Sequence, residues 1–246
     1  MRDGILGFIV EVIKYPYRYR KRIAHNKAYN NMLTLKTPKD RFAEIYKLNL
    51  WSSVESGSGP GSEIAYTTNL RSWLIEIINS LNLKTFVDAP CGDFNWMKYV
   101  LPEVEIKYIG LDIVEEVIER NISLYASNNI EFRSANICED KLPDCDIVMV
   151  RDCLFHLSYE DINNFLINLS KTNYKYFLTT THIVDGKFKN SDITTGDYRL
   201  IDLFSQPFGF NKENVLNRVD DSHDDNSQKR EMILLEKGSV PRHLPI

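Results

Sequence analysis

Two apolar runs that each end in an acid mark the centre of the chain. They are Thr85–Asp88 and Ile109–Asp112, and the small-residue turn Ala89–Gly92 follows the first of them. The pattern predicts a strand, a tight turn, the opening of a helix and a second strand. An α/β protein holds a nucleoside in this way, because the acid after the second strand can bind ribose hydroxyls.

Apolar periodicity predicts further elements on both sides of this centre. Helices are expected over residues 38–49, 64–81, 114–126 and 162–169, and strands over residues 130–133, 145–150, 174–181 and 230–236. Thr37 is placed as an N-cap and Pro38 at the first helical position of the first helix. Alternating strands and helices favour an α/β protein with a largely parallel sheet.

The length of 246 residues fits one α/β domain with an N-terminal extension. We expect residues 1–50 to form a helical extension and residues 51–246 to form the main domain. Hydrophobic residues make up 43% of the chain, which is enough to supply a full core.

The turn after the first strand departs from the dinucleotide-binding pattern Gly-x-Gly-x-x-Gly, which seats a pyrophosphate at a helix N-terminus. Pro90 occupies the first glycine position, only Gly92 remains, and Asp93 stands where a phosphate would approach. The Asp93 carboxylate would repel a pyrophosphate, but it would not repel a nucleoside with a cationic or zwitterionic tail. The turn therefore disfavours NAD and favours S-adenosyl-L-methionine, whose sulfonium and ammonium groups are positive.

The same stretch, Asp-Ala-Pro-Cys-Gly-Asp-Phe-Asn-Trp-Met over residues 88–97, resembles motif I of the class I S-adenosylmethionine-dependent methyltransferases. Asp88 takes the acid position of the motif, and Gly92 takes the glycine of closest approach. Pro90, Asp93 and Phe94 replace more usual glycines.

This version of the motif also resembles a bacterial subset associated with surface-polysaccharide biosynthesis. In that subset a Trp…Glu-Ser-x-Ser-Gly-x-Gly-Ser segment precedes the domain, much like residues 51–62 here. The resemblance covers roughly residues 42–236, and it is more specific for cofactor and fold than for substrate. It implies a Rossmann-like, seven-stranded, mostly parallel sheet with an antiparallel last strand and helices on both faces.

The resemblance implies S-adenosyl-L-methionine as cofactor. In the family an acid or amide at the end of the third strand contacts the adenine, which makes Asn136 the candidate, although an Asn in an ordinary turn is the alternative. The residues expected to bind the cofactor are Trp51, Ser56, Gly57, Asp88, Pro90, Cys91, Gly92, Asp93, Trp96, Asp112, Ile113, Asn136 and Arg151.

Two irregular segments are candidates for ligand contacts. Residues 51–62 are dense in Gly and Ser, and we favour a loop that covers the cofactor over a flexible linker. Residues 182–212 are long for a connecting segment, and such loops are usually functional. Within them Asp197, Tyr198 and Arg199 offer an acceptor, an aromatic platform and a cation, which suit a sugar substrate. A structural crossing loop is the alternative.

Methyl transfer to a hydroxyl needs an acceptor held in line and a base that removes its proton. His156 and His182 both follow strand ends, where the pocket is expected, and histidine is well matched to proton transfer near neutral pH. We favour His156 as the base, with Asp152 orienting or assisting it and His182 as the competitor. A structural hydrogen bond or a packed ring is the alternative for each histidine.

The net charge and the cysteine content limit which ligands and partners the protein is expected to bind. The net charge of −4 and the pI near 5.8 argue against a general nucleic-acid binder. Cys91, Cys138, Cys145 and Cys153 lack zinc-site spacing, so we expect reduced thiols in a cytoplasmic protein. The acidic run 220–225 is expected to be a solvated hairpin loop, and no metal is expected.

The N-terminus is basic. The first thirty residues carry a net charge of +5, which leaves −9 for the remainder. The apolar stretch 5–13 is too short to span a bilayer and lacks the order of a signal peptide. Residues 1–27 could contact an anionic membrane peripherally, but we favour a helix packed on the domain or on a second subunit, so an oligomer is possible.

The leading functional hypothesis is O-methylation of a sugar or an activated sugar intermediate of a bacterial capsule or other surface glycan. Methylation of a phosphate-type or amine acceptor is the first alternative. A non-catalytic protein that binds the cofactor and stabilises another enzyme is the second.

Overall fold

The computed structural model describes residues 19–222 and 228–245. Its centre is one seven-stranded sheet with the order β3-β2-β1-β4-β5-β7-β6. The strands are β1 (Thr85–Asp88), β2 (Lys107–Asp112), β3 (Ile130–Ser134), β4 (Ile147–Val150), β5 (Tyr176–His182), β6 (Val215–Asp220) and β7 (Arg230–Glu236). Strands β1 to β5 pair in parallel, whereas β7 runs antiparallel to both β5 and β6. The predicted sheet, with its antiparallel last strand, is confirmed.

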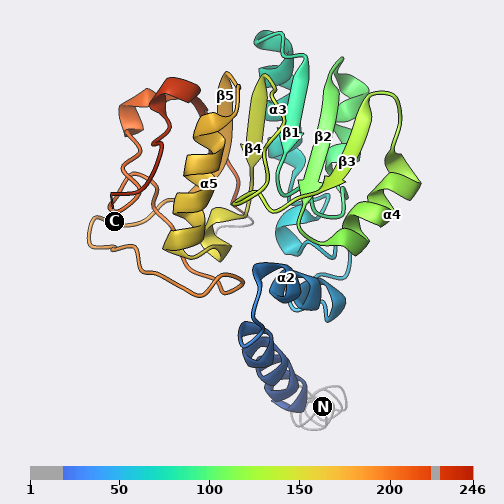
Figure 1. The fold of residues 1–246 in the computed structure, drawn as a ribbon, viewed down its shortest axis with the longest axis vertical. Helices are drawn as coiled ribbons and strands as arrows, with labels where there is room; N and C mark the ends of the chain where they lie inside the picture. Colours follow the sequence, from blue (N-terminus) through green and yellow to red (C-terminus); the bar gives the residue numbers. More distant parts are fainter. Residues whose placement is uncertain (1–18, 223–227, 246) are drawn as a thin grey trace, which may run out of the picture.

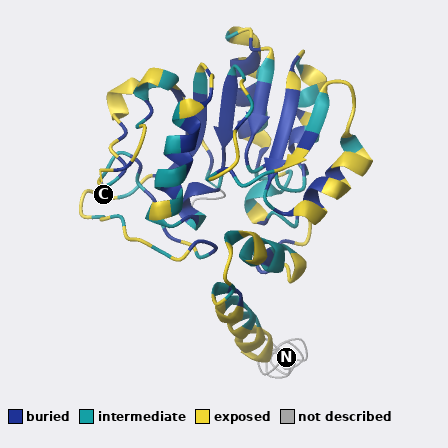
Figure 2. Cartoon of the chain, viewed as in Figure 1, coloured by how far each residue is buried: buried dark blue, intermediate teal, exposed yellow. Residues whose placement is uncertain are grey.

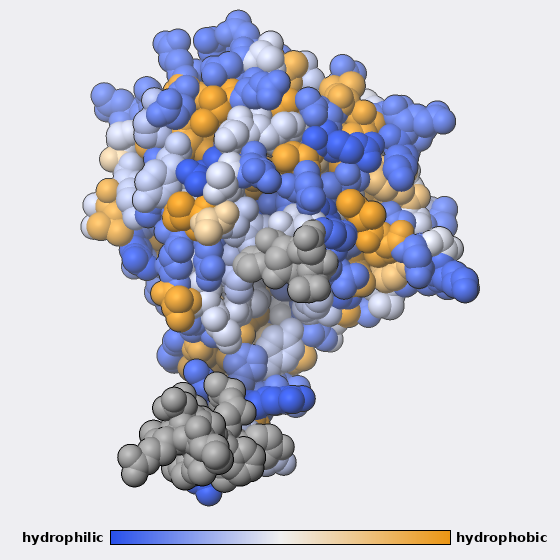
Figure 3. All heavy atoms as spheres, turned by 180° about the vertical axis from the view of Figure 1, so that it is seen from behind, coloured by the Kyte–Doolittle hydropathy of each residue, from blue (hydrophilic) through white to orange (hydrophobic). Residues whose placement is uncertain are grey.

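Helices cover both faces of this sheet, as Figure 1 shows. They are α3 (Thr68–Ser80), α4 (Glu115–Tyr125) and α5 (Tyr159–Lys171). Because neighbouring strand residues point to opposite faces, Phe86 packs with α3 and α4 while Val87 packs with α5. The central strands are therefore buried on both sides (Figure 2). The face seen from behind is largely hydrophilic, with apolar side chains scattered among polar ones (Figure 3).

The expected helix after the first turn is absent between β1 and β2. Two short 3₁₀ turns, Met97–Tyr99 and Leu101–Glu103, take its place. Phe94 has a left-handed backbone with φ +58°, and its ring packs 5.3 Å from that of Tyr108, centroid to centroid. Its insertion into the core prevents helical winding directly after the turn, and Pro102 offers no N–H for a helical hydrogen bond.

The N-terminal helices lie at one end of the sheet. Residues 19–33 form a helix that projects from the body, and α2 (Pro38–Lys47) lies across the carboxyl edge of the strands (Figure 1). Thr37 caps α2 as predicted, because its hydroxyl accepts the N–H of Asp40 at 3.1 Å. The apolar stretch 5–13 and most of the basic N-terminus lie outside the described residues. None of the helices described here is long and apolar enough to cross a membrane.

Candidate functional site

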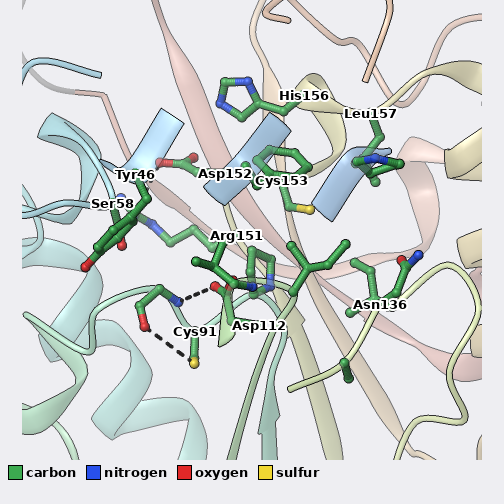
Figure 4. A pocket seen from close by; sticks show the side chains of 18 of the residues that line it. Tyr46, Ser58, Cys91, Asp112, Asn136, Arg151, Asp152, Cys153, His156 and Leu157 are labelled. Atoms are coloured by element: carbon green, nitrogen blue, oxygen red, sulfur yellow. Dashed lines mark hydrogen bonds and ion pairs between the residues drawn. The ribbon is translucent and has the colours of Figure 1, made fainter. Parts of the chain in front are cut away.

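A cavity opens at the carboxyl ends of β1, β2 and β4, beside the turn that follows β1 (Figure 4). It encloses about 1050 Å³ of space, including its open mouth. Ten of the thirteen predicted cofactor residues line it: Trp51, Asp88, Pro90, Cys91, Gly92, Trp96, Asp112, Ile113, Asn136 and Arg151. Carboxyl groups outnumber cations in the lining, since Asp88, Asp112, Asp152 and Asp161 face one arginine, Arg151.

Asp112 is held by the turn after β1. Its Oδ2 accepts the N–H of Gly92 at 3.0 Å, and its Oδ1 accepts the N–H of Val114 at 2.9 Å. Gly92 has φ +53°, and a Cβ there would lie 2.2 Å from Oγ of Ser58, so this position needs glycine. Burial raises the pKa of Asp112 to about 6, although these backbone hydrogen bonds favour the carboxylate.

Asp88, at the end of β1, is the second buried acid of the cavity. Its Oδ2 accepts the hydroxyl of Tyr108 at 2.7 Å. Burial raises the pKa of Asp88 to about 7, which outweighs that hydrogen bond and the attraction of Arg151. A cation placed beside Asp88 and Asp112 would favour their ionised forms, because it offsets the cost of burying the charge.

Three predicted cofactor residues lie outside the cavity lining: Ser56, Gly57 and Asp93. The Ser56 hydroxyl and the Gly57 N–H both donate to the Asp93 carboxylate at 2.9 Å. The Asp93 N–H in turn donates to Oγ of Ser58 at 2.9 Å. These polar groups therefore fasten residues 51–62 to the turn after β1, and Trp51, Ser58 and Ser62 of the same loop line the cavity.

His156 lines the opposite side of the cavity from Asp112, together with Asp152 (Figure 4). Its Nδ1 lies 2.8 Å from the backbone carbonyl of Asp197. A carbonyl can only accept, so Nδ1 carries the hydrogen and Nε2 of the neutral ring has the free lone pair. Burial lowers the pKa of His156, which favours this neutral form. The indole of Trp51 packs against the ring with centroids 5.5 Å apart.

Asp152 is held by arginines. Its Oδ2 accepts Nη2 of Arg230 at 2.8 Å and lies 3.6 Å from Nη1 of Arg151. Burial alone would raise the pKa of Asp152, but the two guanidinium groups hold it below its usual value. Asp152 is therefore a weak base, and its negative charge favours a protonated His156.

His182, the competing candidate base, does not line the cavity. It is the last residue of β5, is buried, and its Nδ1 accepts the N–H of Ile201 at 3.1 Å. Burial lowers the pKa of His182 to about 4. In this structure the ring is held by that hydrogen bond and lies outside the cavity that His156 lines.

The three predicted substrate residues also lie outside the cavity lining. Arg199 is buried, and its Nη1 donates to the carbonyl of Leu157 at 2.7 Å, so it supports the chain next to His156. Asp197 holds His156 through its backbone carbonyl. Tyr198 is half exposed, with its ring centroid 5.8 Å from that of His156.

The cavity is also lined by residues that the sequence pattern did not single out. Phe42 and Tyr46 of α2 line the cavity, whereas the apolar pattern of residues 38–49 predicted only a helix. Asp161 and Thr195 also line it, and their side chains are hydrogen-bonded to each other.

The acidic run 220–225 was expected to be a solvated loop, but Asp221 does not fit this expectation. Asp221 is buried and accepts Nε and Nη2 of Arg151 at 2.9 and 3.0 Å. Residues 223–225 of that run lie outside the described residues. No cluster of histidine, cysteine, aspartate or glutamate suited to a metal ion occurs within residues 19–222 and 228–245.

No protein-family model matches the chain, and no curated protein sequence matches it significantly. Solved structures do resemble it. A Burkholderia thailandensis 1,6-didemethyltoxoflavin-N1-methyltransferase with bound 1,6-didemethyltoxoflavin and S-adenosylhomocysteine is 14% identical, with a TM-score of 0.59 over 82% of this chain and 91% of that one. The methyltransferase domain of bacterial CtHen1 is 14% identical, with a TM-score of 0.52 over 70% of this chain and 98% of that one.

A geranyl diphosphate methyltransferase in complex with GPP and sinefungin is 11% identical, with a TM-score of 0.51 over 68% of this chain and 76% of that one. At these identities the likeness is one of fold. The chain has the Rossmann-like fold of class I S-adenosylmethionine-dependent methyltransferases.

Proposed function

We propose that the protein is a methyltransferase that uses S-adenosyl-L-methionine. The acid-rich cavity at the carboxyl edge carries this proposal, because a sulfonium and an ammonium group suit the carboxyls of Asp88 and Asp112. Asp112 retains acceptor capacity for ribose hydroxyls beside its two backbone N–H donors. The bound cofactor would supply an activated methyl group. A pyrophosphate would meet these same acids and be repelled.

The acceptor atom is proposed to be a hydroxyl oxygen. Transfer to a hydroxyl needs a base, and the free lone pair of His156 Nε2 supplies one in the cavity. The lowered pKa of His156 keeps the ring in its basic form at neutral pH. Asp152 stabilises the imidazolium once the proton has been taken, since its carboxylate stays ionised.

A sugar or activated sugar intermediate is the proposed acceptor class. Support comes from the likeness of residues 51–62 to the surface-polysaccharide subset and from the polar pair Asp161 and Thr195 in the cavity. The structural neighbours are named for unlike acceptors, including 1,6-didemethyltoxoflavin and geranyl diphosphate. An amine or phosphate-type acceptor, and a non-catalytic role, are the alternatives to be tested.

Calorimetry with S-adenosylhomocysteine tests the cofactor. The wild-type protein should bind it, and Asp112→Ala should weaken binding by at least about tenfold, since a hydrogen bond to a charged group contributes roughly 1.5–3 kcal/mol. Asp185→Ala, which removes an exposed carboxylate outside the cavity, is the matched control and should bind normally. Absence of binding to the wild type would contradict the proposal.

Turnover with methyl-labelled cofactor tests the acceptor. Sugar nucleotides and extracted glycan intermediates are compared with amines and phosphate-type acceptors. His156→Gln should lower kcat by roughly 10²–10⁴ while S-adenosylhomocysteine still binds. His243→Gln, at an exposed position outside the cavity, should behave as wild type. Transfer only to an amine would replace the sugar hypothesis, and binding without any transfer would favour the non-catalytic role.

A further inference from the structure

One residue, Asp197, connects the N-terminal helix to His156, the proposed base. Tyr29, in the helix over residues 19–33, donates its hydroxyl to Oδ1 of Asp197 at 2.9 Å. The backbone carbonyl of Asp197 accepts Nδ1–H of His156 at 2.8 Å. Asp197 therefore links a helix outside the sheet to the imidazole ring.

Arg41 of α2 holds the same segment from a second side. Its Nη1 donates to the carbonyl of Thr195 at 3.0 Å. Gly196 lies against the Arg41 stem, since a Cβ at this glycine would come within 3.3 Å of Cβ of Arg41. The N–H of Gly196 donates to the carbonyl of His156 at 2.8 Å. Residues 195–197 are thus held between the N-terminal helices and His156.

Trp51, one of the aromatic residues beside the imidazole, follows a residue that is attached to the same helix. Trp51 packs on the His156 ring, and the preceding carbonyl, that of Leu50, accepts Nε2–H of His25 at 2.8 Å. The hydrogen-bonding partner of His156 and one of its aromatic neighbours, Trp51, are therefore both placed by contacts with residues 19–33.

We infer that residues 19–50 set the tautomer and orientation of His156, with Tyr29 and Arg41 as positioning residues. The catalytic consequence rests on the proposed function, whereas the tautomer is a property of the fold. The hydrogen bond made by one ring nitrogen decides which nitrogen carries the proton. A displaced Asp197 carbonyl would release Nδ1–H and allow the Nε2–H tautomer, which has no basic atom at Nε2.

Nitrogen NMR of the full chain labelled with ¹⁵N-histidine tests this directly. The His156 signals are identified by their loss in His156→Gln. The wild type should show the Nδ1–H tautomer, and Tyr29→Phe and Arg41→Met should each show a population of the Nε2–H tautomer. Tyr19→Phe and Lys36→Met change exposed residues of the same N-terminal region and should keep the wild-type tautomer.

Kinetics supply the second readout. Tyr29→Phe and Arg41→Met should each lower kcat by roughly tenfold, because the orientation of the base is lost. Both should leave the Kd for S-adenosylhomocysteine unchanged, because the cofactor contacts remain. A variant that loses its cooperative thermal transition is replaced by Asp197→Ala, which removes the Tyr29 acceptor but keeps the backbone carbonyl. Wild-type tautomer populations in all folded variants would overturn the inference. A wild type that shows the Nδ1–H tautomer but transfers no methyl group would refute the proposed function alone.

Discussion

Ser56 and Asp93 stand 37 positions apart in the chain, yet Oγ of Ser56 lies 2.9 Å from both carboxylate oxygens of Asp93. The acid that disfavours a pyrophosphate is thus the anchor of the loop over residues 51–62. Because Trp51, Ser58 and Ser62 of this loop line the cavity, the anchor controls one of its walls.

Asp93→Ala should therefore weaken the binding of S-adenosylhomocysteine by roughly tenfold, because the loop loses two hydrogen bonds to a carboxylate. Ser56→Ala, which removes one of them, should have a smaller effect in the same direction. Calorimetry measures both, with Ser72→Ala on the exposed side of α3 as control. Equal affinity in all four proteins would show that the loop does not contribute to binding.

Binding should also depend on pH through Asp112. Burial raises the pKa of this carboxyl to about 6, and only the ionised form accepts hydrogen bonds from ribose hydroxyls with both oxygens. The affinity for S-adenosylhomocysteine should rise between pH 5 and pH 8 as Asp112 ionises. Titrations at fixed ionic strength measure this, and Asp112→Asn should remove most of the slope. A flat profile in the wild type would contradict the assignment.

Ionisation of Asp88 should lower the stability of the fold as the pH rises, whereas ionisation of Asp112 should raise the affinity for the ligand. The folded pKa of Asp88, about 7, is raised from 3.8 by burial, so the native state binds the proton more tightly than the unfolded chain. The free energy of unfolding should fall as pH rises from about 4 through about 7, by a few kcal/mol at most. Asp88→Asn keeps an acceptor for Tyr108 and should be more stable than wild type at pH 8 but not at pH 4. Urea unfolding at the two pH values decides this.

Loss of the Asp221 carboxylate should destabilise the fold far more than loss of the Asp220 carboxylate. Without Asp221 the buried guanidinium of Arg151 would lack its paired acceptor, a change that costs about 3–5 kcal/mol. Asp221→Ala should lower the urea midpoint strongly. Asp220→Ala removes the exposed adjacent carboxylate and should change the midpoint little. Similar midpoints for the two variants would argue against the ion pair.

The acids of the cavity were predictable because they depend on local pattern and sheet topology alone. An apolar run that ends in an acid places Asp88 and Asp112 at the carboxyl edge whatever the rest of the chain does. The same reasoning placed His156 there. The helix after the turn was wrongly predicted, because the pattern does not show that Phe94 turns inward with a left-handed backbone.

The remaining differences between expectation and structure concern contacts between distant segments. His182 was expected just beyond its strand, but it is the last residue of β5, pairs with Arg230 of β7 and is buried. Arg199 was expected to bind a ligand, whereas carbonyls more than forty positions earlier accept its N–H groups. Asp221 belongs to an acidic run that looks solvated, and only the folded sheet brings Arg151 to it.

The antiparallel insertion of β7 has a consequence for synthesis on the ribosome. Strand β6 is made before β7, but β7 lies between it and β5, so β6 can join the sheet only after residue 236 has emerged. The Arg230 that holds Asp152 arrives in the same step. A nascent chain that stops before β7 can therefore pair β1 to β5. It lacks the antiparallel strands β7 and β6 at the edge of the sheet, and it lacks the Arg230 charge that balances Asp152 beside His156. Catalytic competence should therefore appear abruptly, once β7 has been synthesised and has paired with β5 and β6.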